Sequence, residues 1–191
     1  MRRWNQGILG SLFAVAMLTG CDEKSGKVSD MSAMKPPPRP VELDQLESWV
    51  GNWTMTGEGN FGGKSMKSTG RVSTSWEADR RALVSRGEEE AEGMGKNSML
   101  EVYTWNPSAK RFNAHYFSSM GDESHGEMTY NAANKSYHIR GKGPDPMSGK
   151  TVIFEGNAKQ IDPNTFEWTW EMWDGMHMKK MGDGKGVMKR A

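Results

Sequence analysis

The segment 172–181 gathers the softest metal-binding side chains of the chain within ten residues. Four methionine thioethers surround one imidazole in the set Met172, Met176, His177, Met178 and Met181. Soft thioether sulfur combined with imidazole favours copper(I). The competing interpretation is that methionine, a flexible side chain, fills an apolar core here. Copper(I) binding is therefore one alternative function that the sequence leaves open.

The remaining chemistry-bearing residues match no catalytic pattern. The histidines His115, His125, His138 and His177 are not spaced as a zinc or catalytic set, and no nucleophile elbow or Cys-x-x-Cys occurs. The run 57–62 matches Gly-x-Gly-x-x-Gly, but a nucleotide site needs a helix after it, and here a strand is expected from Lys67. We therefore predict a glycine-rich hairpin at 57–62, no catalytic residues, no cofactor and no enzymatic activity.

The single cysteine, Cys21, ends the run Leu-Thr-Gly-Cys at 18–21. Before it lie Arg2, Arg3 and an apolar stretch of about ten residues, which is typical of an export signal and too short for a membrane-spanning helix. The run resembles the lipobox of bacterial lipoproteins. That resemblance implies a signal peptide over residues 1–20 and lipidation of Cys21.

Residues 21–40 have the composition of a tether. They show no hydrophobic periodicity and end in a proline-rich run, which is extended and stiff. We expect this segment to hold a folded domain, residues 41–191, at the bacterial cell envelope, facing the periplasm. Asp22 directly follows the cysteine and resembles the signal that retains enteric lipoproteins in the inner membrane, but the choice of membrane stays open.

The charge balance limits the partners of the chain. Without residues 1–20 it holds 23 basic and 24 acidic residues, so it lacks the basic excess that nucleic-acid binding requires. A lone cysteine excludes an internal disulfide and a cysteine zinc site. The expected partners are the membrane, through the lipid, and a small hydrophobic ligand; a protein partner is left unidentified.

Alternating apolar and polar residues after position 50 predict an all-β domain. Residues 41–49 carry apolar side chains on one side and form the one predicted helix. About ten short strands separated by turn residues are typical of a single closed antiparallel β-barrel. The predicted strands are 53–56, 67–77, 81–90, 98–105, 111–118, 124–131, 136–141, 150–160, 165–173 and 185–190.

The interior of such a barrel can hold a small apolar or amphipathic molecule. The strand around Trp168 shows the alternation most clearly, because Phe166, Trp168, Trp170 and Met172 share one face. The same aromatic residues suit a ligand-binding lumen and a filled core, so a structural or interaction lipoprotein is the alternative. The predicted ligand-lining residues are Trp76, Tyr103, Trp105, Tyr116, Tyr130, Trp168 and Trp170.

Two stretches carry a family resemblance. The first runs from Leu46 into Gly51-Asn-Trp53 and resembles the opening of lipocalin-like barrels. There the tryptophan closes the barrel floor beneath a basic residue of the last strand, which implies a contact of Trp53 with Lys189 or Arg190.

The second stretch, Gly-Lys-Gly-Pro-Asp-Pro-Met-Ser-Gly-Lys at 141–150, resembles the DUF1579 family of bacterial proteins. Met-Lys-Ser-Thr-Gly at 66–70 and a late methionine-rich strand extend the similarity over 43–190. The resemblance implies a lipocalin-like barrel and brings no established activity. Barrels of this architecture include haem-binding ones, which makes haem ligation through His177 a further alternative.

Overall fold

The described residues, 36–145 and 148–191, form one short helix and ten strands in this computed structural model. The predicted signal peptide, Cys21 and most of the predicted tether lie outside them. In chain order the elements are η2 (Val41–Trp49), β1 (Gly51–Phe61), β2 (Lys64–Glu77), β3 (Ala82–Ala91), β4 (Gly95–Asn106), β5 (Arg111–Ser118), β6 (Glu123–Asn131), β7 (Ser136–Pro144), β8 (Thr151–Asp162), β9 (Thr165–Asp174) and β10 (Lys180–Arg190).

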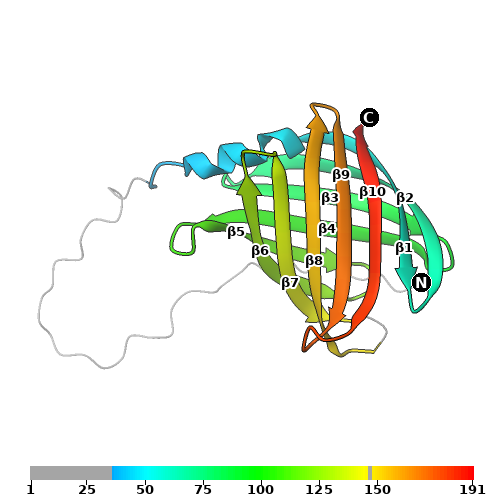
Figure 1. Cartoon of the computed structure of the whole chain (residues 1–191). Helices are drawn as coiled ribbons and strands as arrows, with labels where there is room; N and C mark the ends of the chain where they lie inside the picture. The colour runs from blue at the N-terminus through cyan, green and yellow to red at the C-terminus, as the bar shows by residue number, and fades with distance from the viewer. Residues whose placement is uncertain (1–35, 146–147) are drawn as a thin grey trace, which may run out of the picture. The chain divides into compact units, whose positions relative to one another are not determined.

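The ten strands close into a barrel. Each strand pairs antiparallel with the next along the chain, and β10 pairs with β1 from Trp53–Arg190 to Phe61–Gly182. In Figure 1 the red β10 accordingly lies beside the blue-green β1. Closure pairs both edges of the described sheet, which removes the exposed edges that promote aggregation. The prediction of a single antiparallel barrel of about ten strands is confirmed.

Side chains alternate between the inside and the outside of the barrel, and the inward ones at one end form the hydrophobic core. Figure 1 shows η2 lying across this end, which we call the closed end; the opposite end is the open end. The buried core residues are Leu43, Leu46, Trp53, Leu83, Tyr103, Phe112, Met128, Tyr137, Ala158, Phe166 and Met188.

The helix that covers the closed end is a 3₁₀ helix. Its apolar residues Leu43, Leu46 and Trp49 are spaced by three, which is the spacing that a 3₁₀ helix places on one face. Leu43 and Leu46 are fully buried, and the Tyr137 hydroxyl donates a hydrogen bond to the Gln45 carbonyl at 2.6 Å. η2 therefore seals this end with apolar side chains and is fixed to β7.

The floor contact inferred from the lipocalin-like opening is present, and Arg190 makes it. Its guanidinium carbon lies 4.3 Å from the centre of the Trp53 ring. The same guanidinium donates a hydrogen bond to the Val50 carbonyl at 2.9 Å. Gly51 adopts a φ of +135°, and a Cβ there would clash with this guanidinium, so the position requires glycine.

Tryptophan rings pack directly on a wall without side chains. The inward positions Gly57 and Gly59 of β1 face Gly186 and Gly184 of β10. A Cβ at Gly57 would lie 2.6 Å from the Trp168 ring, and a Cβ at Gly184 would lie 2.5 Å from the Trp170 indole nitrogen. The glycines thus make room for two indoles of β9 against the backbone of their neighbours.

The predicted glycine-rich hairpin at 57–62 is wrong in its extent. β1 continues to Phe61, and the turn consists of Gly62 and Gly63, which have φ values of +57° and +85°. The last strand similarly begins at Lys180 instead of residue 185. In both places, glycines two residues apart face Trp168 or Trp170. Packing of these indoles against the glycines holds both segments in strands.

Replacing Gly186 by alanine should lower the free energy of unfolding by about 1–3 kcal/mol, because the new methyl group overlaps the Trp168 ring and the Thr56 carbonyl. The matched control is Gly156→Ala on the inward face of β8, where the nearest neighbouring atom is the Thr169 carbonyl at 3.5 Å. We expect the control to change stability by less than about 1 kcal/mol. Urea denaturation measures both, and equal effects would contradict the packing described.

Replacing Arg190 by methionine should lower the free energy of unfolding by about 1–2 kcal/mol, because it removes the contact with the Trp53 ring and the hydrogen bond to the Val50 carbonyl. Lys189→Met, on the outward face of β10, is the control and should have little effect. Thermal unfolding followed by tryptophan fluorescence would compare the two variants. A similar loss in both would show that the floor contact does not stabilise the barrel.

Candidate ligand site in the barrel lumen

Most inward-facing residues toward the open end keep part of their surface accessible, unlike those beneath η2, whereas Met172 of β9 and Val152 of β8 are buried there. Tyr103 and Phe166, at the closed end, are 3% and 0% exposed. Farther along the same strands, Glu101 of β4 and Trp170 of β9 are only half-buried. A closed sheet shields inward side chains from the outer solvent, so their accessibility indicates a lumen that water enters at the open end.

One wall of this lumen is aromatic. Trp168 and Trp170 project from β9 onto the glycines of β10 and β1, and Phe61 packs on Trp170 with ring centres 4.9 Å apart. Phe154 of β8 lies beside this wall, because it pairs with Met172 of β9. This wall offers flat apolar surface to a bound molecule.

The opposite wall is polar. A row of inward residues crosses five neighbouring strands by direct pairing: Thr74, Ser85, Glu101, Tyr116 and Ser124. In the closed ring of ten strands β4 is five positions away from β9, so Glu101 and the two tryptophans stand on opposite walls. The lumen therefore presents hydrogen-bonding groups on one side and aromatic rings on the other.

Most members of the polar row already have partners. The hydroxyls of Thr74 and Ser85 lie 2.9 Å apart, and Asn97 donates to the Tyr116 hydroxyl at 3.3 Å. The Tyr103 hydroxyl donates to Glu101 at 3.1 Å. Burial raises the pKa of the Glu101 carboxyl, and the bond from Tyr103 opposes this rise to a smaller extent.

Burial also raises the pKa of the Tyr116 hydroxyl, to about 12. The negative charges of Asp122 and Glu101 act in the same direction. Tyr116 is therefore a neutral hydrogen-bonding group at every physiological pH.

All seven predicted ligand-lining residues occupy inward positions, but the structure divides them. Tyr103 is part of the buried core, and Trp76, Trp105, Tyr130 and Trp168 pack against that core. The Trp76 nitrogen donates to Glu47 of η2, so its ring belongs to the closed end. Tyr116 and Trp170 lie toward the open end, and Trp168 joins the core to the aromatic wall.

The predicted copper(I) residues are distributed over two sides of the barrel wall. Met172 is buried on the inward face of β9, and Met181 is half-buried on β10. Met176 and Met178 lie in the turn between these strands and are 73% and 72% exposed. The turn is fixed by Asp174, whose carboxylate accepts hydrogen bonds from the backbone of Met178 and its neighbour at 2.7 and 3.3 Å.

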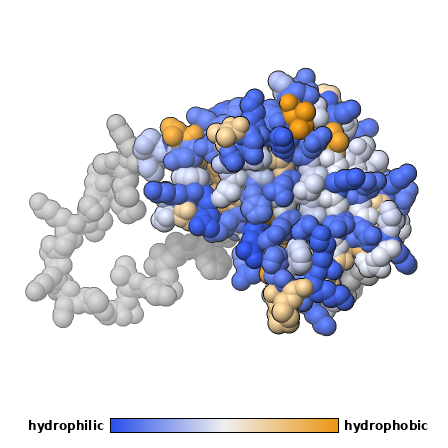
Figure 2. All heavy atoms as spheres, in the orientation of Figure 1, coloured by the Kyte–Doolittle hydropathy of each residue, from blue (hydrophilic) through white to orange (hydrophobic). Residues whose placement is uncertain are grey.

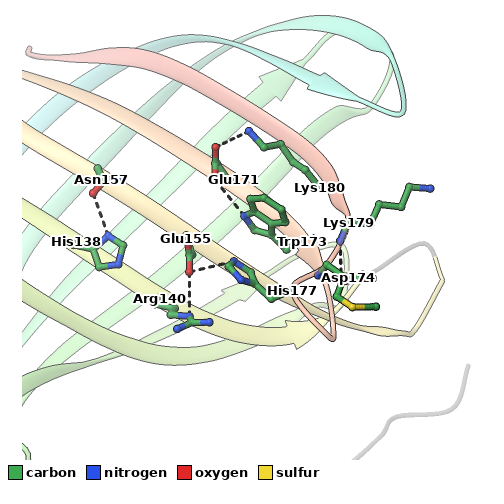
Figure 3. Close-up of polar contacts among 11 residues, drawn as sticks. His138, Arg140, Glu155, Asn157, Glu171, Trp173, Asp174, His177, Lys179 and Lys180 are labelled. Carbon is green, nitrogen blue, oxygen red and sulfur yellow. Dashed lines mark hydrogen bonds and ion pairs between the residues drawn. The ribbon is translucent and has the colours of Figure 1, made fainter.

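His177, also in this turn, is engaged by polar and aromatic neighbours. Figure 3 shows its ring directed toward Glu155, with the two closest atoms 3.4 Å apart, while Arg140 contacts the same carboxylate at 3.1 Å. The ring centres of His177 and Trp173 are 4.6 Å apart. Within the described residues no three histidine, cysteine, aspartate or glutamate side chains are grouped to hold a metal ion.

Two shallow grooves lie on the outer surface of the described barrel. A groove of about 690 Å³ lies between outward rows of β2–β5, with Arg71, Arg86, Leu100 and Phe117 along it. A second groove, of about 600 Å³, crosses β8–β1. The face shown in Figure 2 is mainly hydrophilic. Nowhere in residues 36–145 and 148–191 is there a helix with the length and apolar character needed to span a membrane.

Sequence reasoning missed Glu101 and Asn97. Both alternate with Tyr103 and Trp105, two of the predicted lining residues, but Asn97 lies one residue before the predicted strand 98–105. The period of two that places these aromatic residues inside also places Glu101 there. Asn97 follows the same alternation only because β4 begins at Gly95.

Comparison with known structures identifies the same architecture elsewhere. The crystal structure of Rv2717c from M. tuberculosis has a TM-score of 0.62 at 14% identity, covering 81% of this chain and 99% of that one. The S-type phycobiliprotein lyase CPES from Guillardia theta has a TM-score of 0.54 at 10% identity, covering 80% and 94%. These similarities establish the fold alone. No curated protein matches the chain.

The family model described as a protein of unknown function (DUF1579) matches residues 41–184, which include η2 and nearly all of the barrel. This match agrees with the resemblance carried by residues 66–70 and 141–150. The chain belongs to the DUF1579 family.

Proposed function

We propose that this protein is a binding module that holds a small amphipathic molecule in the barrel lumen. The observation that carries the proposal is the pair of opposite walls, with Trp168 and Trp170 on β9 and Glu101 and Tyr116 on β4 and β5. An apolar body would pack on the indoles while polar groups meet the other wall. Ligand sites in proteins combine apolar surface with a few polar groups in this way.

We propose binding instead of catalysis. His115, His125 and His138 occupy outward positions of β5, β6 and β7, and His177 lies in the turn between β9 and β10. None of these imidazoles shares the lumen with Glu101. The polar wall thus offers hydrogen bonds without a histidine beside the carboxyl for proton transfer.

The module would act at the bacterial envelope, facing the periplasm, with Cys21 as its lipid anchor. The support is the sequence alone: an export signal over 1–20, the Leu-Thr-Gly-Cys ending and the proline-rich tether that follows. Asp22 favours the inner membrane. The first described residues, from Pro36, lead into η2 at the closed end of the barrel.

Binding in the lumen predicts that Trp170→Leu weakens the affinity for naphthylmethanol, a neutral aromatic probe, by roughly tenfold, because a large aromatic surface is lost. The matched control, Trp173→Leu, lies on the outward face of the same strand and should retain the affinity. Isothermal titration calorimetry on the purified full-length chain measures both. Equal affinities in both variants, or no binding by the unmodified chain, would overturn the proposal.

Lipid anchoring predicts that Cys21→Ala abolishes incorporation of labelled palmitate and moves the chain out of the membrane fraction in its native host. A thioether-linked lipid requires the cysteine sulfur, and a hydroxyl in the tether cannot replace it. Ser25→Ala is the control and should remain labelled and membrane-bound. Unchanged labelling of the Cys21→Ala chain would contradict the anchor.

A further inference from the structure

The lumen is acidic. Between the floor and the rim, the inward positions of the described strands hold two carboxylates, Glu89 and Glu101, and no lysine, arginine or histidine. The basic residues of these strands face outward, as Arg71 and Arg86 do, or lie at the strand ends, as Arg190 does. An anionic ligand would therefore meet like charge inside the barrel.

Glu101 has unused hydrogen-bonding capacity that faces the lumen. Within residues 36–145 and 148–191, Tyr103 alone donates a hydrogen bond to this carboxyl, whereas a carboxylate can accept about four. The neighbouring Ser85 hydroxyl is engaged with Thr74, and the Tyr116 hydroxyl accepts from Asn97. No side chain of the polar row thus neutralises Glu101, although shielding a carboxylate from water is costly without a cation.

The facing wall suits the same kind of ligand. Trp168 and Trp170 present indole rings, which offer flat apolar surface to the body of such a ligand. Glycines behind these rings keep them close to the barrel wall. One molecule with an ammonium group and a flat apolar body complements both walls.

We propose that the ligand of this lumen is an amphipathic amine whose protonated nitrogen pairs with Glu101 and whose apolar body packs on Trp168 and Trp170. This rests on the proposed function and specifies the chemical class of its ligand. The Glu101 carboxylate sets the charge preference, while the tryptophans bind the apolar part regardless of charge.

Three probes that share one ring test the preference: naphthylmethylamine, naphthylmethanol and naphthylacetic acid. By calorimetry at neutral pH, the amine should bind roughly tenfold or more tightly than the alcohol, which a charge-assisted hydrogen bond would supply. The acid should bind most weakly. Glu101→Gln should remove the advantage of the amine and leave the affinity for the alcohol unchanged.

The matched control is Glu90→Gln, an exposed outward residue of β3, which should keep the amine preference. If the unmodified chain binds amine and alcohol equally, this inference fails while the proposed function stands. If it binds none of the probes, both fail. Equal losses for amine and alcohol in Glu101→Gln would show a structural effect and overturn the assigned pairing.

The pH dependence gives a second test that needs no variant. Since burial raises the pKa of Glu101, acid conditions protonate it and remove its attraction for the amine. The affinity for the amine should therefore rise as pH rises through that pKa, while the affinity for the alcohol stays level. The facing groups Ser85 and Thr74 do not titrate in this range, and Tyr103 and Tyr116 lose protons only at far higher pH. Glu89, two residues from Gly87 on β3, is the remaining carboxyl of the lumen. Glu89→Gln should therefore preserve the rise of amine affinity with pH. An amine affinity that does not change with pH in the unmodified chain would overturn the inference.

Discussion

The packing of two indoles against a glycine wall is the constraint on which the barrel depends. Trp168 and Trp170 fit inside only because the neighbouring strands carry glycine at the positions that face them. With side chains there, the rings would be forced toward the centre of the lumen or the closing strands would separate. The same packing therefore governs both the pairing of β1 with β10 and the space left inside.

Much of the fold follows from residue patterns that are local. Alternation predicts the strands, and the lone helix, the floor contact of Trp53 and the family follow from short motifs. The strand ends are less accessible to this reasoning, because a glycine run such as 57–62 has the composition of a turn. Only the tryptophans of β9, more than 100 positions away, explain why these glycines extend a strand. Such distant packing leaves no local signature.

The candidate site was predictable in part. The alternation of residue types in the strands predicts which aromatic residues face inward. It does not tell which of them lie beneath η2 and which lie toward the open end. That distinction depends on strand register, which decides how far along the barrel each residue lies. Glu101 was within reach of the alternation itself, since it shares a face with Tyr103. A polar residue on a predicted inward face is thus a stronger sign of a ligand site than one more aromatic ring.

The floor contact also bears on how the chain acquires its fold. Arg190 donates a hydrogen bond to a carbonyl 140 positions earlier in the chain. β1 can pair with its second neighbouring strand only after β10, the last strand in the chain, has been made. Contacts between such distant segments form late and slowly. Until residue 190 has been synthesised, β1 and β9 expose unpaired edges and the glycine wall lacks one of its two strands. The barrel must therefore stay open, and vulnerable to association with other chains, through nearly all of its synthesis.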